Sequence, residues 1–155
     1  MRVLIGPDPP LVCAASGADR GERAPAGLQA ADGKPLTIGL INNMPDGAVE
    51  WTERQFLDLL DVAAGQTAIH IRLFSLPEIP RSETVRRHMN GRYCRFDELW
   101  DSQLDALIVT GTEPHAALLT EEPYWRSFTR VIDWAQTNTI STVWSCLAAH
   151  AAVLH

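Results

Sequence analysis

Four short apolar runs recur along this chain, and a segment with helical spacing separates each run from the next. The runs cover residues 36–41, 68–74, 105–111 and 140–144. The run at 36–41 is typical of a strand that is buried on both faces of a sheet. The run at 68–74 continues the alternation as a second strand, and the run at 105–111 is typical of a buried strand that ends at a glycine. Repeated β-α order with short connections implies right-handed crossovers. The predicted fold class is therefore α/β, with a parallel sheet covered by helices on both faces.

The segments between the runs predict the helices. Thr52 and Gln55 have the spacing of a capping box, and the apolar residues that follow recur at helical intervals up to Gly65. A further helix and a connector are expected after Pro80, and another helix from about Pro123.

The chain is expected to hold one domain. Residues 6–34 are rich in Gly, Ala and Pro without a sustained period, so residues 1–34 are predicted to form an irregular leader. Order is expected to begin near Pro35, with residues 35–155 forming the α/β domain. A length of 155 residues with 46% hydrophobic and 21% charged residues is typical of one globular unit.

Charge and cysteine usage exclude several function classes. The net charge of -6 argues against nucleic-acid binding, which requires clustered Lys and Arg. Five arginines lie between residues 81 and 95, but acidic residues are interspersed among them, which favours a solvated helix face. No apolar run approaches the ~20 residues of a membrane span, and the first residues do not form a secretory signal. Three cysteines without metal-ligand spacing favour a reducing compartment, so a cytoplasmic protein without a metal site is expected.

The last apolar run passes into a helical segment at Cys146. A strand that feeds sharply into a helix holds the side chain at the junction above the sheet, with the backbone N–H groups of the helix start directed at whatever it attacks. The partial positive charge of the helix N-terminus favours a thiolate there. Cys146 is therefore a candidate nucleophile for acyl transfer. A small buried cysteine that packs where strand meets helix is the alternative.

Ligands of open parallel sheets bind at the carboxyl ends of the strands. Loops 42–46, 112–115 and 146–147 are therefore expected to converge on one crevice. No G-x-G-x-x-G or Walker pattern follows any run, so nucleotide binding through a glycine-rich loop is not predicted.

Several motifs, in this order, resemble the homoserine O-acyltransferases of methionine biosynthesis. They are Asn43-Met-Pro45, ERQFLDLL at 53–60, RYCRFDE at 92–98, DALIVTG at 105–111, Pro123-Tyr-Trp125 and the junction at Cys146. The resemblance extends from about Leu36 to the end of the chain and implies a fold like that of the class I glutamine amidotransferases. The family's catalytic His and Glu lie well downstream of the nucleophile, so the chain resembles the N-terminal half of a longer enzyme.

The resemblance implies a ping-pong transfer, without a bound cofactor, from acyl-CoA to the hydroxyl of L-homoserine through a thioester on Cys146. The backbone N–H groups of Leu147 and of Thr112 would stabilise the oxyanion. His115 resembles the acyl-selecting position, where Gly and Glu are usual, and a protonated imidazole there would favour a succinyl over an acetyl group. A plain loop histidine is the alternative. The implied partners are acyl-CoA and L-homoserine, with a homodimer left open.

The chain departs from the family pattern in ways that keep other functions open. Asp46 follows Pro45 where the family commonly has lysines, so a lysine role in donor binding is lost. A glutamine-amidotransferase-like cysteine hydrolase normally has glycine two residues from the nucleophile on both sides, where this chain has Trp144 and Ala148.

A catalytically silent binding half is the other alternative. His150 lies four residues beyond Cys146 and shares its helix face, but a helix-face histidine without a catalytic role is the favoured interpretation.

Overall fold

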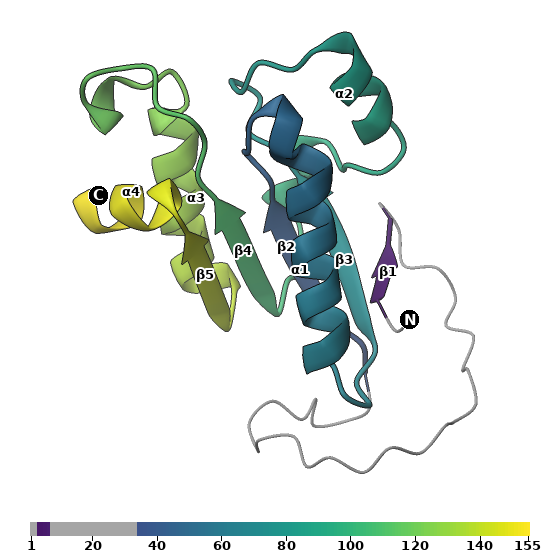
Figure 1. The fold of residues 1–155 in the computed structure, drawn as a ribbon. Helices are drawn as coiled ribbons and strands as arrows, with labels where there is room; N and C mark the ends of the chain where they lie inside the picture. The colour runs from purple at the N-terminus through teal and green to yellow at the C-terminus, as the bar shows by residue number, and fades with distance from the viewer. Residues whose placement is uncertain (1–2, 7–33) are drawn as a thin grey trace.

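The computed structural model describes residues 3–6 and 34–155 (Figure 1). Within these residues one sheet has five strands in the order β1-β3-β2-β4-β5, and every neighbouring pair is parallel. The strands are β1 (Val3–Ile5), β2 (Leu36–Ile41), β3 (Ile69–Phe74), β4 (Ala106–Thr110) and β5 (Ser141–Ser145). The predicted parallel sheet is confirmed.

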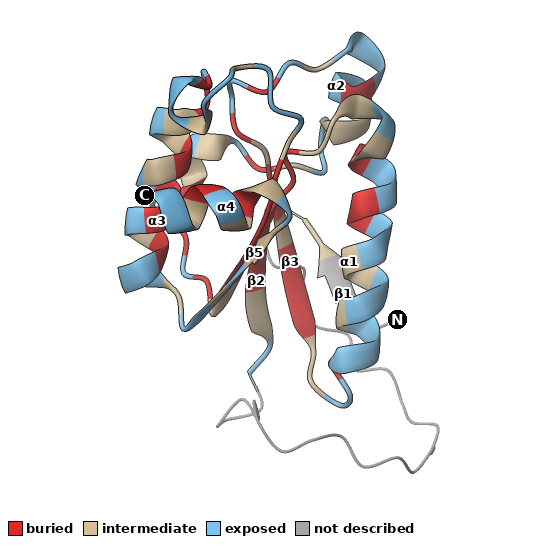
Figure 2. Ribbon diagram, turned by 60° about the vertical axis from the view of Figure 1, so that its left-hand side comes forward, coloured by how far each residue is buried: buried red, intermediate tan, exposed pale blue. Residues whose placement is uncertain are grey.

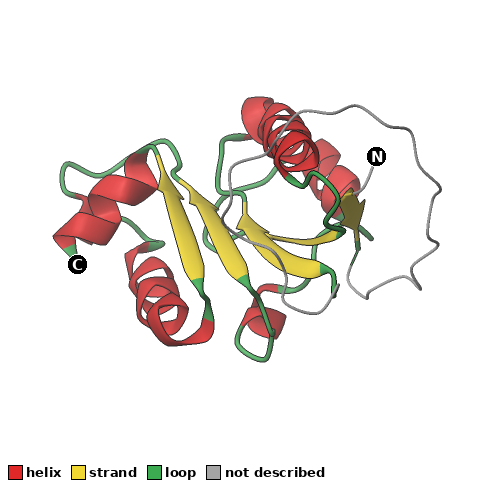
Figure 3. Cartoon of the chain, turned by 90° about the horizontal axis from the view of Figure 1, so that it is seen from below, coloured by secondary structure: helices red, strands yellow, loops and turns green. Residues whose placement is uncertain are grey.

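Helices cover both faces of this sheet, as predicted. The α-helices are α1 (Val49–Ala63), α2 (Glu83–Met89), α3 (Trp125–Asn138) and α4 (Leu147–Leu154). Single 3-10 turns occur at Asp46–Ala48, Phe96–Leu99 and Leu119–Glu121. Viewed along the sheet, α1 lies on one face and α3 on the other (Figure 3). None of the described helices is both long and apolar enough to cross a membrane.

The two faces carry two separate hydrophobic clusters. In β4, Ile108 belongs to the cluster that packs with Phe56 of α1, whereas Leu107 and Val109 belong to the cluster that includes Phe128 of α3. This division follows from the pleat of a strand, in which successive side chains point to opposite faces. The buried residues are concentrated in the sheet and in the helix faces turned toward it (Figure 2).

The strand order fixes where the sheet can bind a ligand. From β2 the chain crosses to β3 on one side, returns past β2 to β4, and continues to β5. The direction of winding therefore reverses between β2 and β4, and open α/β sheets bind ligands at such a point, outside the carboxyl ends of the strands. The loops that follow β2, β4 and β5 lie at this edge (Figure 1).

Two expectations need correction. Part of the predicted leader is ordered, because Val3–Ile5 forms β1 and pairs in parallel with β3, and Val3 lies opposite Ile69; residues 7–33 lie outside the described part of the chain. The first helix begins at Val49 rather than after Thr52, because the 3-10 turn at Asp46–Ala48 leads directly into it. Thr52 is therefore a buried residue inside α1 and forms no capping box.

Candidate active site

Cys146 has the backbone conformation of a strained junction. It lies between the end of β5 and the start of α4, with φ 57° and ψ -131°. Among the described residues it is the only non-glycine residue with positive φ. Such a conformation costs about 1–3 kcal/mol and persists where the surrounding structure imposes it. The side chain is exposed, so the alternative of a buried core cysteine is wrong.

Gly111 allows the end of β4 to approach the start of α4 closely. A Cβ at Gly111 would lie 2.7 Å from the Cβ of Leu147, 2.8 Å from its backbone nitrogen and 3.0 Å from that of Ala148. The Gly111 N–H also donates to the carbonyl of Ser145 at 3.0 Å, which continues the β4-β5 pairing up to the junction. A glycine is therefore required here for space.

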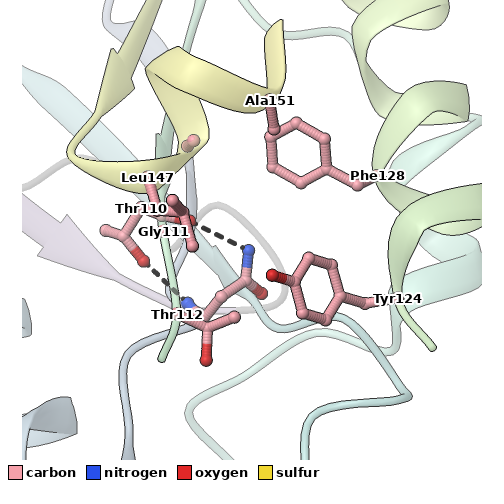
Figure 4. A pocket seen from close by; sticks show the side chains of 9 residues that line it. Thr110, Gly111, Thr112, Tyr124, Phe128, Leu147 and Ala151 are labelled. Carbon is pink, nitrogen blue, oxygen red and sulfur yellow. Dashed lines mark hydrogen bonds between the residues drawn. The ribbon is translucent and has the colours of Figure 1, made fainter. Parts of the chain in front are cut away.

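This close approach brings the two predicted oxyanion-hole residues together. Leu147 and Thr112 line one small cavity, together with Gly111 (Figure 4). The first N–H groups of a helix have no acceptor within the helix. The backbone nitrogens of Leu147 and Ala148 lie beside Gly111, at 2.8 Å and 3.0 Å from the position of a Cβ there.

Asn43 joins the strand ends that frame this cavity. Its backbone N–H donates to Oγ1 of Thr110 at 2.8 Å, and its side-chain amide donates to the carbonyl of Thr110 at 3.1 Å, as the dashed lines in Figure 4 show. Its Oδ1 accepts from the N–H of Leu76 at 3.0 Å. Because Asn43 is 1% exposed, these bonds are shielded from water and hold the ends of β2, β3 and β4 together.

Arg81 fixes the loop that follows β2. Its guanidinium donates to the carbonyl oxygens of Asn42 and Met44 and pairs with Asp46 at 3.4 Å. The N–H of Ser82 donates to Oδ2 of Asp46 at 2.7 Å, and hydrogen bonds from Ser82, with a smaller contribution from Arg81, hold the pKa of Asp46 below its usual value. Asp46 is therefore a structural anchor of this loop.

His115 lies in the loop between β4 and α3, where its side chain is exposed. Its backbone N–H and that of Ala116 donate to Oε1 of Glu122, at 2.5 Å and 2.8 Å. Glu122 is 4% exposed, so a buried carboxylate fixes the backbone of this loop. His115 is not among the residues that line the cavity shared by Leu147 and Thr112.

Tyr124 is a site residue that sequence reasoning missed. It is 6% exposed, it lines the same cavity as Gly111, and its hydroxyl has no hydrogen-bond partner among the described residues (Figure 4). Burial, together with the nearby charge of Glu122, raises the pKa of Tyr124 to about 12, so the hydroxyl keeps its proton at neutral pH. The sequence places Tyr124 in the motif Pro123-Tyr-Trp125 but gives its hydroxyl no role.

Three of the other described histidines are bonded or buried away from Cys146. His155 contacts Oδ1 of Asp133 at 2.8 Å, His88 contacts Glu53 at 2.9 Å, and His70 is buried in β3. His150 is exposed on α4. Over residues 3–6 and 34–155, no group of His, Cys, Asp and Glu side chains is arranged to hold a metal ion.

Comparison with known proteins identifies the family to which this chain is similar. The family model described as homoserine O-succinyltransferase matches residues 23–155. A homoserine O-succinyltransferase of Rhodopseudomonas palustris is 48% identical over 82% of this chain and 38% of its own length. One of Bradyrhizobium japonicum is 50% identical over 85% of this chain and 42% of its own length. The chain thus spans about two fifths of these curated relatives.

Proposed function

Because the chain belongs to the homoserine O-succinyltransferase family, we propose that it supplies the nucleophile of an enzyme that transfers an acyl group from acyl-CoA to the hydroxyl of L-homoserine. The observation that carries this proposal is the strained, exposed Cys146 between β5 and α4. The names of the relatives favour a succinyl donor and a place in methionine biosynthesis.

In the first half-reaction, the Cys146 thiolate attacks the thioester carbonyl carbon of the acyl-CoA. A new C–S bond forms, the bond to the CoA sulfur breaks, and CoA leaves as a thiolate that takes up a proton. The N–H groups of Leu147 and Thr112 stabilise the negative oxygen of the tetrahedral intermediate. Loss of one such donor typically lowers the rate by about 10²–10³-fold.

In the second half-reaction, the hydroxyl oxygen of homoserine attacks the acyl-cysteine and gives its proton to a general base. The C–S bond to Cys146 then breaks, which releases O-acylhomoserine and restores the thiolate. A positioned base contributes typically about 10²–10⁴-fold. The family resemblance assigns this base to a residue downstream of the Cys146 junction.

His115 is our candidate for the residue that recognises the end of the acyl chain and so selects between a succinyl and an acetyl group. A protonated imidazole attracts the free carboxylate of a succinyl group, whereas an acetyl group has no charge. At an effective dielectric constant near 20, such a pair at about 4 Å gains up to about 4 kcal/mol before desolvation is subtracted. Its exposed position at the carboxyl edge of the sheet supports this role.

The release of CoA tests the proposed function against the cysteine-hydrolase alternative. The chain is incubated separately with succinyl-CoA, acetyl-CoA and glutamine, and free CoA and ammonia are measured by chromatography. We expect stoichiometric CoA release, faster from succinyl-CoA, no ammonia, and no CoA release by the Cys146→Ser variant. Cys146-dependent ammonia without CoA release would favour the hydrolase instead.

A further inference from the structure

A second hollow lies between α2 and the segment 75–81 that follows β3. Its volume is about 720 Å³. Four arginines line it, and they are Arg81, Arg86, Arg87 and Arg95. We call this hollow the arginine groove. Because the proposed function requires a CoA thioester, we propose that the arginine groove binds the adenosine 3′-phosphate 5′-diphosphate end of the acyl-CoA.

Two of the four arginines have charge to offer to phosphates. Arg81 already pairs with Asp46, and Arg95 pairs with Asp97, which leaves Arg86 and Arg87. Arg86 donates its Nε to the carbonyl of Arg81 at 3.0 Å, and no carboxylate in the described part of the chain lies within ion-pair distance of it. Arg87 lies 3.9 Å from Glu83, and both side chains are more than 70% exposed, so that pair is weak. The guanidinium groups of Arg86 and Arg87 can each donate to a phosphate in a bidentate manner.

The acidic residues of the groove do not cancel this charge. Two glutamates, Glu78 and Glu83, line it beside the four arginines. Glu78 accepts a hydrogen bond from Oγ of Ser127 on α3, at 2.5 Å, which directs that carboxylate toward α3. The chain as a whole has a net charge of -6, so a local excess of arginine is a departure from its average.

The groove also offers apolar surface against which the adenine ring of CoA can pack. Pro77 and Pro80 line it and are exposed. The ring of Tyr93 forms part of the wall, and its hydroxyl is held by a 2.7 Å hydrogen bond to Oε1 of Glu53. Apolar and aromatic walls with a few charged groups are typical of sites for cofactor-sized ligands.

The separation of the strands next to the groove and next to Cys146 is comparable with the length of the pantetheine arm of CoA. In the sheet β3 is three strand positions from β5, which corresponds to roughly 14 Å at the usual spacing of parallel strands. The pantetheine arm between the thioester and the diphosphate reaches roughly 15 Å when extended, by ordinary chain dimensions. Arg81 joins the groove to the loop that follows β2, because it lines the groove and donates to the carbonyl of Asn42 at 2.9 Å.

Adenosine 3′,5′-bisphosphate is the probe for this site, because its binding requires no acyl transfer. Binding to the 155-residue chain is measured by isothermal titration at low and high salt. We expect salt-sensitive binding to the parent, and a dissociation constant raised about tenfold or more in the double variant Arg86→Ala, Arg87→Ala.

Arg54→Ala is the matched control. Arg54 on α1 lies 3.8 Å from Asp58 four residues on and is 75% exposed, so it resembles Arg87 in its pairing and exposure, but it lies outside the groove. This control should bind the probe like the parent. Failure of the parent to bind, or an equal loss in Arg54→Ala, would overturn the proposal. Circular dichroism of each variant establishes that it is folded.

A second measurement tests the role of the groove independently of the proposed function. The parent should be acylated faster by succinyl-CoA than by succinyl-N-acetylcysteamine, which lacks the nucleotide. The double variant should lose this preference and keep the parent's rate with the short thioester. A preference that survives in the double variant would place the nucleotide elsewhere. If neither thioester acylates the parent, the proposed function fails. The bisphosphate titration then still shows whether the arginine groove binds the nucleotide.

Discussion

At the scale of single residues, the site depends on backbone conformation and on space. Cys146 adopts a positive φ that L-residues rarely occupy, and Gly111 leaves the room that the start of α4 takes up. Both features concern the same contact between the end of β4 and the β5-α4 junction. The position of the thiol and the position of the neighbouring N–H groups are therefore set together.

Cys146 is predicted to react faster with iodoacetamide than Cys94. Cys146 is exposed at a helix N-terminus, whereas Cys94 is 7% exposed in the core. Alkylation of the native chain, followed by peptide mapping over a pH series, measures both rates. Faster labelling of Cys94 in the folded chain would contradict the assignment of Cys146 as the reactive thiol.

Gly111→Ala is predicted to disturb the site and to lower the stability of the domain. The added Cβ meets backbone and Cβ atoms of Leu147 at 2.7–2.8 Å, so β4 or α4 must shift, and overpacking of this kind costs typically about 1–3 kcal/mol. Urea unfolding and the rate of Cys146 alkylation are the measurements. Gly47→Ala is the control, because nothing lies within 4 Å of a Cβ at Gly47. Equal behaviour of the two variants would show that the close approach at Gly111 is unimportant.

At the scale of secondary-structure elements, the sequence predicts β2 and β4 because each is a short, mostly apolar run between turn residues. It misses β1, because Val3–Ile5 is short, borders Gly6, and is stabilised by pairing with β3 more than sixty residues away. It places the start of α1 too late, because a capping-box spacing at Thr52 coincides by chance with the helix interior.

In the candidate site too, features that are contiguous in the sequence are predicted, and features that depend on residues distant in the sequence are missed. Cys146 and Leu147 are predicted because a strand-turn-helix junction is contiguous in the sequence. The loop that contains Asn43 is predicted to reach the crevice, but the hydrogen bonds of Asn43 are missed, because its partner Thr110 is 67 residues away and only the folded sheet brings them together. Tyr124 is missed because a buried hydroxyl and an ordinary core aromatic have the same sequence pattern.

His70 in β3 is predicted to make the stability of the domain depend on pH. Burial, and then the charge of Arg72, lower the pKa of His70 below 6.5, so the unfolded chain binds a proton that the folded chain excludes. The contribution of His70 is therefore fully present above its unfolded pKa and is lost as the pH falls toward the folded pKa. Between about pH 7.5 and about pH 5.5, the urea midpoint of the parent should fall more than that of His70→Gln. Parallel pH profiles for the two proteins would contradict this.

At the scale of the whole molecule, the parallel sheet explains why the residues of the candidate site lie together. Every strand ends at the same edge, so the loops after β2, β4 and β5 meet although they are far apart in the sequence. The chain matches about two fifths of the length of its relatives, and this part contains the junction at Cys146, the neighbouring N–H groups and the arginine groove.

The 155-residue chain is predicted to accept an acyl group without turning over. Within the described residues no hydrogen bond joins Cys146 to a histidine, and His155 is engaged by Asp133. Without a positioned base, attack by the homoserine hydroxyl loses typically about 10²–10⁴-fold. The acyl-enzyme should therefore persist when L-homoserine is added, as followed by chromatography of O-succinylhomoserine. Sustained, Cys146-dependent product formation would show that this chain holds the base, with His150 and His115 as the first candidates.

The most direct test of the central claim is the intact mass of the chain after incubation with succinyl-CoA. We predict a single succinyl adduct that peptide mapping assigns to Cys146 and that hydroxylamine removes, as expected for a thioester. The Cys146→Ser variant, folded by circular dichroism, should form no such adduct. An unmodified parent, or an adduct that persists in Cys146→Ser, would contradict the account of Cys146 as the acyl-accepting nucleophile.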